Sequence, residues 1–460
     1  MQNIIVPRLT TLLMGLLFFA SNPALCQNLK RRAFLGAAFK PLTETQKKKI
    51  AKEGLYVSAV RPDGTFNEIG ITAGAIVQEL NGIKINSRED INRVLSKPLR
   101  AGDGVEVSVL ENKQAKFYKG KALMRPKETH PDVHIDYDEV SYKDNMLRSI
   151  LYRPKGIENP PVVFYLQGYT CQSIEYQPFM PMKKLINDWI KNGFAVYLVE
   201  KPGLGDSDCK LGCAEIDFPQ ELKAFSVAYS NLWKNSKIDS DNVFLFGHSM
   251  GGIIAPILAQ QISPKGVLVF GTVGKKWYDY MKDVVTEQQI LFGSTREQVT
   301  ENSKQSFPFL TDLMMNKKSN TEMINNPLYS DYLNNQRIVE GLKKGYYLAR
   351  HYTFWQTLGD VDIPKEWSNV STNVFVMHGE YDVQAINSKY AKLIASNVNA
   401  NKGNATFKII PKTDHVFLEF SSMAENIKAL TNGTYNQALK TKYSPRVAEH
   451  SIKWMKKLIN

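Results

Sequence analysis

The chain has 460 residues, of which 43% are hydrophobic and 22% are charged, as is ordinary for a globular protein. Its formal net charge of +13 raises the question of a nucleic-acid partner. The lysines, however, fall in short scattered groups, without a long basic run or a zinc-finger or RNA-binding signature, so we expect no nucleic acid among the partners. At roughly 100–200 residues per domain, the length predicts two or three domains.

Residues 1–26 have the pattern of a secretory signal peptide. Arg8 precedes an apolar run over residues 12–20, and the polar segment that follows ends in small residues. The run is far shorter than the roughly 20 apolar residues that span a bilayer, so cleavage after Cys26 should leave no integral membrane span. We therefore expect export to the periplasm or the medium. Lipid attachment at Cys26 ranks second, because Leu25 before it is bulky.

Short strands and one helix make residues 27–125 a candidate for a small α+β module. Four short runs rich in β-branched residues predict strands, and the turn Asn81-Gly82 joins two of them. A helix is predicted over residues 87–95, with Ser87 as its N-cap and Asp90 three positions later.

This order of elements resembles a PDZ domain over residues 31–123. The segment at the position of the family's carboxylate-binding loop consists of Phe34, Leu35, Gly36 and Ala37. The resemblance implies that backbone N–H groups of this loop bind the C-terminal carboxylate of a peptide, which pairs with the edge of the sheet. One departure is Ala75, where an aspartate commonly follows the glycine; that position is structural and does not exclude binding.

After a linker at residues 126–135, marked by two prolines and several charges, the pattern changes. A hairpin comes first, and near-continuous apolar strands then alternate with helices. Strands that are apolar throughout indicate a mostly parallel sheet covered by helices on both faces. We assign residues 136–274 and 371–460 to the two parts of this α/β core.

Residues 275–370 interrupt the alternation and are rich in helix formers and in aromatic and methionine side chains. We expect a helical cap inserted into the core, in which residues 346–358, YYLARHYTFWQTL, fit a helix. An aromatic cap favours a substrate with an apolar acyl or aromatic group.

The sequence Gly-His-Ser-Met-Gly, residues 247–251, lies between a predicted strand and a predicted helix. In such a turn the serine occupies the tip in an unfavourable backbone conformation, and side chains two positions before and after it would collide with neighbouring backbone. The N-terminus of the following helix adds partial positive charge near a developing anion. Ser249 is therefore the candidate nucleophile.

A serine hydroxyl needs a base, and the base needs a carboxylate that orients it. Asp382 comes just after one predicted strand and His415 just after the next, where open α/β sheets place their sites. We expect His415 to accept the proton of Ser249 while Asp382 holds the imidazole. Weaker alternatives for the acid are Asp279, Glu380 and Asp414. The other histidines near these elements are interpreted as packing, surface or structural residues: His248, His351 and His378.

The tetrahedral intermediate of acyl transfer requires N–H donors for its oxyanion. One donor is predicted to be the backbone N–H of Met250, which follows the nucleophile. The other should come from the loop after the third core strand, where Gln167-Gly168 allows a turn. Tyr169 is the first candidate there and Thr170 the second.

Three cysteines remain after residue 26, and an oxidising compartment permits one disulfide among them in three pairings. Cys171 and Cys213 follow two loops that we expect to be adjacent at the catalytic face, so a bridge between them would fix the oxyanion loop. Cys209 with Cys213 is the local alternative. We expect no metal site, because no histidine or second cysteine pair has zinc-like spacing.

Residues 134–460 resemble an α/β-hydrolase with a cap between the sixth and seventh strands of its sheet. The resemblance implies a serine hydrolase that cleaves a carboxylic ester or related acyl substrate through an acyl-enzyme, without a metal or organic cofactor. A serine peptidase whose PDZ-like module docks a peptide substrate is one alternative, and a non-catalytic binding protein is another. The whole chain resembles exported bacterial hydrolases with an N-terminal PDZ-like domain.

Overall fold

The computed structural model describes residues 29–44, 53–87, 90–91, 94 and 99–460. The predicted signal peptide and Cys26 lie outside these residues. Among the helices within the described ranges, none has the length and apolar character that crossing a membrane requires.

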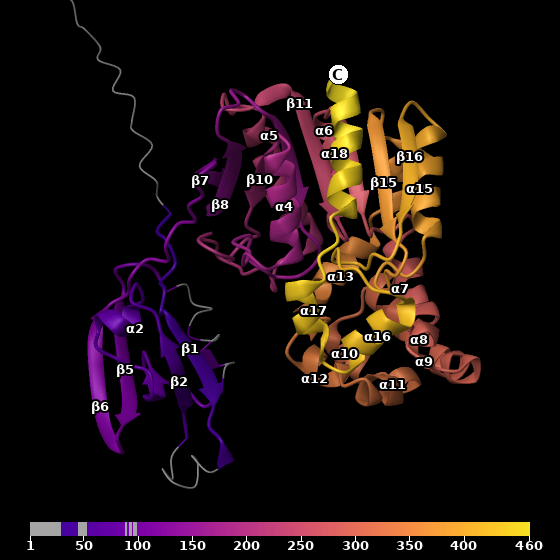
Figure 1. Ribbon diagram of the computed structural model, residues 1–460. Helices are drawn as coiled ribbons and strands as arrows, with labels where there is room; N and C mark the ends of the chain where they lie inside the picture. The colour runs from indigo at the N-terminus through magenta and orange to yellow at the C-terminus, as the bar shows by residue number, and fades with distance from the viewer. Residues whose placement is uncertain (1–28, 45–52, 88–89, 92–93, 95–98) are drawn as a thin grey trace, which may run out of the picture.

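The N-terminal domain is built on an antiparallel sheet that is separate from the large sheet (Figure 1). Its described elements are β1 (Ala37–Pro41), β2 (Leu55–Val60), α2 (Thr65–Glu68), β3 (Ile76–Leu80), β4 (Ile83–Lys84), β5 (Gly104–Glu111) and β6 (Gln114–Lys121). The strands follow the order β1-β2-β3-β5-β6, and β4 pairs with β3 through the predicted turn. Asn81 and Gly82 have φ values of 48° and 76°, the left-handed pair that a two-residue hairpin turn requires.

The large sheet has eight strands in the described part of the chain, ordered β16-β15-β12-β11-β9-β10-β8-β7. Their bounds are β7 (Val133–Tyr142), β8 (Asn145–Pro154), β9 (Pro161–Leu166), β10 (Ala195–Val199), β11 (Asp239–His248), β12 (Gly266–Phe270), β15 (Asn373–Gly379) and β16 (Asn404–Ile410). β7 and β8 form the predicted hairpin. The other six strands of this sheet pair in parallel with one another: β9, β10, β11, β12, β15 and β16. Parallel pairing buries both faces, which explains the near-continuous apolar strands.

Helices cover both faces of this sheet (Figure 1). On one face, α4 (Pro181–Lys191) and α18 (Arg446–Ile459) pack in one hydrophobic core, which contains Trp189 and Phe246. On the other face, α5 (Phe218–Leu232), α6 (Gly251–Gln261) and α15 (Lys389–Asn399) pack in a second core. This is the predicted α/β-hydrolase architecture, and it brings the carboxyl ends of the parallel strands to one edge.

The cap lies at that edge and is inserted between β12 and β15, the sixth and seventh strands along the chain in the large sheet. Its helices are α7 (Trp277–Val285), α8 (Glu287–Leu291), α9 (Arg296–Met314), α10 (Asn320–Ile324), η1 (Pro327–Tyr329), α11 (Ser330–Asn335), α12 (Ile338–Lys343), α13 (Tyr352–Gly359) and α14 (Ile363–Ser368). Two later helices, α16 (Met423–Thr431) and α17 (Tyr435–Thr441), lie at the same end of the molecule (Figure 1).

The prediction of one helix over residues 346–358 was wrong in its first half. β13 (Tyr346–Tyr347) and β14 (Arg350–His351) form a short hairpin, and α13 begins only at Tyr352. Leu348 and Ala349 turn the chain with φ values of 45° and 61°. The hairpin brings Arg350 to a buried carboxylate, Glu221, and this tertiary contact outweighs the helix propensity of the segment.

The N-terminal segment meets the hydrolase domain at a buried cluster of charges. Arg31 donates hydrogen bonds to Asp206 at 2.5 Å and to Glu175 at 2.8 Å, and the backbone N–H of Arg32 donates to Asp206 at 2.8 Å. Arg148, on β8, also bonds to Asp206, at 3.2 Å. Buried charges need such partners, so this cluster fixes how the chain enters the N-terminal domain.

Candidate active site

Ser249 lies in the sharp turn between β11 and α6, with a φ of 53° that side chains rarely adopt. A Cβ on Gly247 would lie 2.6 Å from the carbonyl oxygen of Gly251, and one on Gly251 would lie 2.1 Å from that of Leu166. Both contacts are too short for any side chain, so the two glycines allow the turn. The strain stored at Ser249 is typical of functional positions.

His415 and Asp382 form a buried pair beyond the ends of β16 and β15. The Nδ1 of His415 lies 2.8 Å from Oδ2 of Asp382, while Oδ1 accepts the N–H groups of Gln384 and Ala385, each at 2.8 Å. These bonds use both carboxylate oxygens and fix the imidazole with Nδ1 toward the acid. Gly271 makes room for the pair, since a Cβ there would lie 2.9 Å from Nδ1 of His415.

The pair is electrostatically coupled. Burial disfavours ionisation of Asp382, yet the charge and hydrogen bond of His415 outweigh it and lower the pKa of the carboxyl to about 2. Burial also lowers the pKa of His415, but the Asp382 carboxylate raises it further, so the net shift is upward. Asp382 is therefore an anion at neutral pH and strengthens His415 as a base.

The alternative acids have other partners or positions. Asp414 accepts the N–H groups of Val416 and Leu418 at 3.0 and 2.7 Å and a hydrogen bond from the Tyr435 hydroxyl. Burial raises the pKa of Asp414 to about 6. Glu380 accepts the N–H of Lys412 at 2.8 Å, and Asp279 lies half-buried on α7. Among these carboxylates, the His415 side chain is bonded only to Asp382 in the described residues.

His248, interpreted from the sequence as a packing residue, contacts the loop that carries His415. Its Nε2 lies 2.8 Å from the carbonyl oxygen of His415, and its Nδ1 lies 3.1 Å from the Tyr165 hydroxyl. A neutral ring satisfies both contacts when Nε2 donates and Nδ1 accepts from the hydroxyl, and burial lowers the pKa of His248 to about 3. Sequence reasoning missed this role; the one available signal was a polar ring at a buried position beside the nucleophile.

His351 and His378, the other two histidines interpreted from the sequence, make no bond to Ser249 or Asp382 in the described residues. His351 lies on β14, where its Nδ1 is 2.7 Å from the hydroxyl of Thr353, and His378 is buried on β15.

The loop after β9 runs directly beside Ser249. A Cβ on Gly168 would lie 3.1 Å from Cβ and 3.5 Å from Oγ of Ser249. The N–H groups of Tyr169, Thr170 and Met250 donate to no acceptor within the described ranges. They are therefore free to donate to a ligand; the assignment of Tyr169 and Met250 as oxyanion donors stays a prediction.

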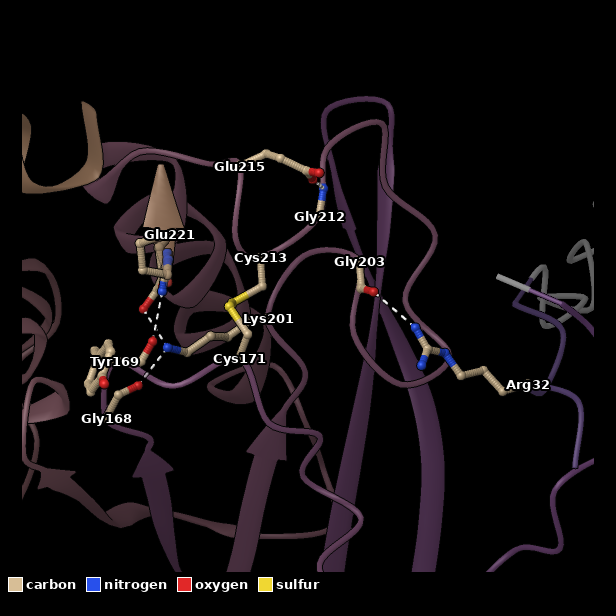
Figure 2. Close-up of a disulfide and its surroundings, with 11 residues drawn as sticks. Arg32, Gly168, Tyr169, Cys171, Lys201, Gly203, Gly212, Cys213, Glu215 and Glu221 are labelled. Atoms are coloured by element: carbon tan, nitrogen blue, oxygen red, sulfur yellow. Dashed lines mark hydrogen bonds and ion pairs between the residues drawn. A yellow bond between two sulfur atoms is a disulfide. The ribbon is translucent and has the colours of Figure 1, made fainter. Parts of the chain in front are cut away.

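The predicted disulfide between Cys171 and Cys213 is confirmed (Figure 2). It joins the loop after β9 to the loop after β10, and it leaves Cys209 as a half-buried thiol. The bridge thus anchors the segment two residues beyond Tyr169.

Ser249 and His415 line one cavity of about 150 Å³ beneath the cap. Its wall is mainly apolar and includes Ile253, Val273, Trp277, Met281, Val284 and Trp355. No lysine, arginine, aspartate or glutamate from the described chain lines it. The described residues also contain no group of three His, Cys, Asp or Glu side chains that could hold a metal ion. The cavity thus offers an uncharged, aromatic surface next to the serine.

In the N-terminal domain, the predicted loop Phe34–Ala37 leads into β1, which is the edge strand of its sheet. Gly36 has a φ of 68°, and a Cβ there would lie 2.4 Å from the Cα of Gly64. Neither the N–H of Leu35 nor that of Gly36 donates to an acceptor in the part of the chain that the structure describes.

Two family models match the two domains of this architecture. The model of the family "Serine aminopeptidase, S33" matches residues 162–419, and that of the PDZ domain matches residues 33–117. A search of curated proteins finds no match. Similar solved structures include Est1E from Butyrivibrio proteoclasticus with ferulic acid bound. It shares 14% identity, with coverage of 65% of this chain and 98% of that one and a TM-score of 0.41. A thermostable carboxyl esterase from Bacillus coagulans shares 14% identity, with coverage of 72% and 100% and a TM-score of 0.42. The chain belongs to the serine aminopeptidase S33 family of α/β-hydrolases, and a PDZ domain precedes its hydrolase domain.

Proposed function

We propose that the protein is a serine hydrolase that cleaves a carboxylic ester, or a related acyl substrate, through an acyl-enzyme. The observation that carries the proposal is the cavity shared by Ser249 and His415, with His415 bonded to Asp382. The strained backbone of Ser249 and the free N–H groups of Tyr169 and Met250 support the same chemistry.

The reaction proceeds in two halves. Ser249 Oγ attacks the substrate carbonyl carbon while Nε2 of His415 takes its proton, and the N–H groups of Met250 and Tyr169 receive the oxyanion. His415 then protonates the leaving alcohol. In the second half, His415 takes a proton from water, the resulting hydroxide attacks the acyl-enzyme, and the acid departs as Ser249 regains its proton. Asp382 remains ionised throughout, because its pKa is about 2.

The lining of the cavity favours an ester substrate over a peptide that is bound through its free N-terminus. An aminopeptidase must recognise a free α-ammonium, and a buried carboxylate is the group suited to that task. The described lining of the cavity contains no such carboxylate, and an apolar acyl or aromatic group fits its wall.

Labelling with a fluorophosphonate probe tests the proposal. The wild type should label and hydrolyse p-nitrophenyl esters, whereas Ser249→Ala should do neither. Ser173→Ala is the matched control, because Ser173 bonds to Glu200 and does not line the cavity. Equal labelling of wild type and Ser249→Ala would refute the assignment of the nucleophile.

We also propose that residues 34–37 bind the C-terminal carboxylate of a peptide, as free N–H groups beside an edge strand favour. Fluorescence anisotropy with a C-terminal peptide library should find binders that lose affinity when their carboxylate is amidated. Equal binding of the acid and amide forms would contradict this assignment.

A further inference from the structure

Two cations and one carboxylate form a buried network behind the loop that carries Tyr169. They are Lys201, Glu221 and Arg350, which are 1%, 0% and 1% exposed. Lys201 Nζ lies 2.8 Å from one carboxylate oxygen of Glu221, and Arg350 Nη2 lies 2.7 Å from the other. Lys201 follows β10, Glu221 lies on α5 and Arg350 lies in the cap hairpin, so three distant segments meet here.

Each cation also holds a backbone carbonyl of the loop. Lys201 Nζ donates to the carbonyl oxygen of Gly168 at 2.6 Å, and Arg350 Nη1 donates to that of Tyr169 at 2.9 Å. Figure 2 shows Lys201 between the Gly168 carbonyl and Glu221, with the disulfide beside it. The network therefore fixes two consecutive peptide groups.

Fixing these carbonyls also fixes the N–H groups on the other side of the same peptides. In a trans peptide the N–H points opposite to the C=O, and the described chain contains no cis peptide. The bond from Lys201 therefore turns the N–H of Tyr169 away from the network, and the bond from Arg350 does the same for Thr170. These are the loop's two candidate oxyanion donors, and Gly168 packs directly against Ser249.

The network also leaves positive charge in excess. Burial lowers the pKa of Lys201, and the attraction of Glu221 offsets only part of that shift. The two neighbouring cations outweigh the effect of burial on Glu221, so the pKa of its carboxyl is lowered overall. With the carboxylate of Glu221 ionised, two basic side chains face a single anion. The excess lies on the carbonyl side of the two peptides, where it would favour a negative charge on the N–H side.

A structural role alone does not account for this arrangement. Burying a second cation against a single carboxylate is unfavourable, and apolar side chains of similar volume would fill the space at lower cost. Each cation donates a hydrogen bond to a carbonyl of the loop, and in the described chain neither pairs with an acid other than Glu221.

We propose that Lys201, Glu221 and Arg350 are positioning residues that hold the oxyanion donors of the Gly168–Thr170 segment toward Ser249. Because Arg350 belongs to the cap, the geometry of these donors depends on how the cap sits on the core. This inference rests on the proposed function.

The test compares Lys201→Met and Arg350→Met with the wild type. Each substitution removes one carbonyl anchor and leaves Glu221 with one cation, so no buried carboxylate is left unpaired. We expect kcat for a p-nitrophenyl ester to fall about 100-fold, the effect of a misplaced catalytic group, while KM stays within about twofold. The affinity for a boronic acid, which mimics the tetrahedral intermediate, should fall with kcat/KM.

Arg148→Met is the matched control. It removes a buried arginine that is 2% exposed and leaves its partner Asp206 paired with Arg31. Like the test variants, it removes one of two buried cations that share a carboxylate, but this cation does not bind the loop that carries Tyr169. It should lower the melting temperature as the other variants do, while kcat stays at the wild-type value. If Arg350→Met fails to fold, Arg350→Lys replaces it: the charge is kept, but one ammonium cannot reproduce the forked contacts to Glu221 and Tyr169, so kcat should still fall.

The outcomes separate this inference from the proposed function. An active wild type whose Lys201→Met and Arg350 variants keep kcat and boronic acid affinity would overturn the positioning role alone. A rise in KM at constant kcat would also overturn it, because that pattern indicates substrate binding. A wild type that neither labels nor hydrolyses esters would overturn the proposed function.

Discussion

The loops after β15 and β16 each bury one aspartate beside His415, and they shift the pKa values of the two carboxyls in opposite directions. Asp382 contacts the His415 side chain, and its pKa lies at about 2. Within the described residues, Asp414 receives hydrogen bonds only from neutral groups, and burial raises its pKa to about 6. The two acids therefore differ in pKa because, of the two, only Asp382 is hydrogen-bonded to a ring that becomes cationic.

The largest expected difference between the two acids is in catalysis. Asp382→Asn should lower kcat by about 10⁴-fold, because the amide no longer holds the imidazole in the tautomer that leaves Nε2 free to accept a proton. Asp414→Asn should lower kcat by less than about tenfold, since its bonds position only its own loop. Steady-state kinetics on a p-nitrophenyl ester measure both effects. Equal losses in the two variants would contradict the assignment of Asp382 as the orienting acid.

A smaller effect is expected in the pH profile of kcat/KM. His415 acts as a base when neutral, so activity should fall as pH drops through its pKa, which Asp382 raises above the usual 6.5. Without the charge of Asp382, burial is the main influence on the pKa of His415, and burial lowers it. The residual activity of Asp382→Asn should therefore have its inflection at lower pH. Asp414→Asn should shift the inflection far less. An inflection that does not move in Asp382→Asn would show that the carboxylate does not act on His415.

The smallest effect is expected in the free energy of unfolding. Its dependence on pH has opposite signs for the two acids. Asp382 has a lowered pKa, so its contribution is present above the unfolded value of about 3.9 and is lost as pH falls toward 2. Asp414 has a raised pKa, so the folded state binds the extra proton, and stability falls as pH rises from about 4 to 6. Two pKa units correspond to about 3 kcal/mol.

Urea unfolding of wild type and Asp414→Asn at pH 4.5 and 7.5 measures this contribution. The variant should lose less stability than the wild type over that interval, because its amide carries no charge to bury. A wild type and variant with parallel pH dependence would contradict the raised pKa of Asp414.

Features set by local rules were predictable from the sequence. The turn at Ser249 follows from backbone collisions at Gly247 and Gly251, and the strands follow from apolar runs that parallel pairing buries. The Cys171–Cys213 bridge was predictable once the order of strands placed its two loops side by side.

Features that depend on distant contacts were not predictable. His248 reaches the carbonyl oxygen of His415, and no pattern around His248 signals that partner. The hairpin at residues 346–351 was expected to be helical, because Glu221 and the Tyr169 carbonyl that hold Arg350 lie far away in sequence. The network of Lys201, Glu221 and Arg350 was missed for the same reason.

The proposed mechanism requires Ser249 to form a covalent acyl-enzyme. Intact-mass spectrometry of the Asp382→Asn variant, quenched in acid during turnover of a p-nitrophenyl ester, should find the protein heavier by one acyl group. Peptide mapping should place that group on Ser249. Hydrolysis without any acylated protein, or acylation that persists in Ser249→Ala, would contradict the mechanism.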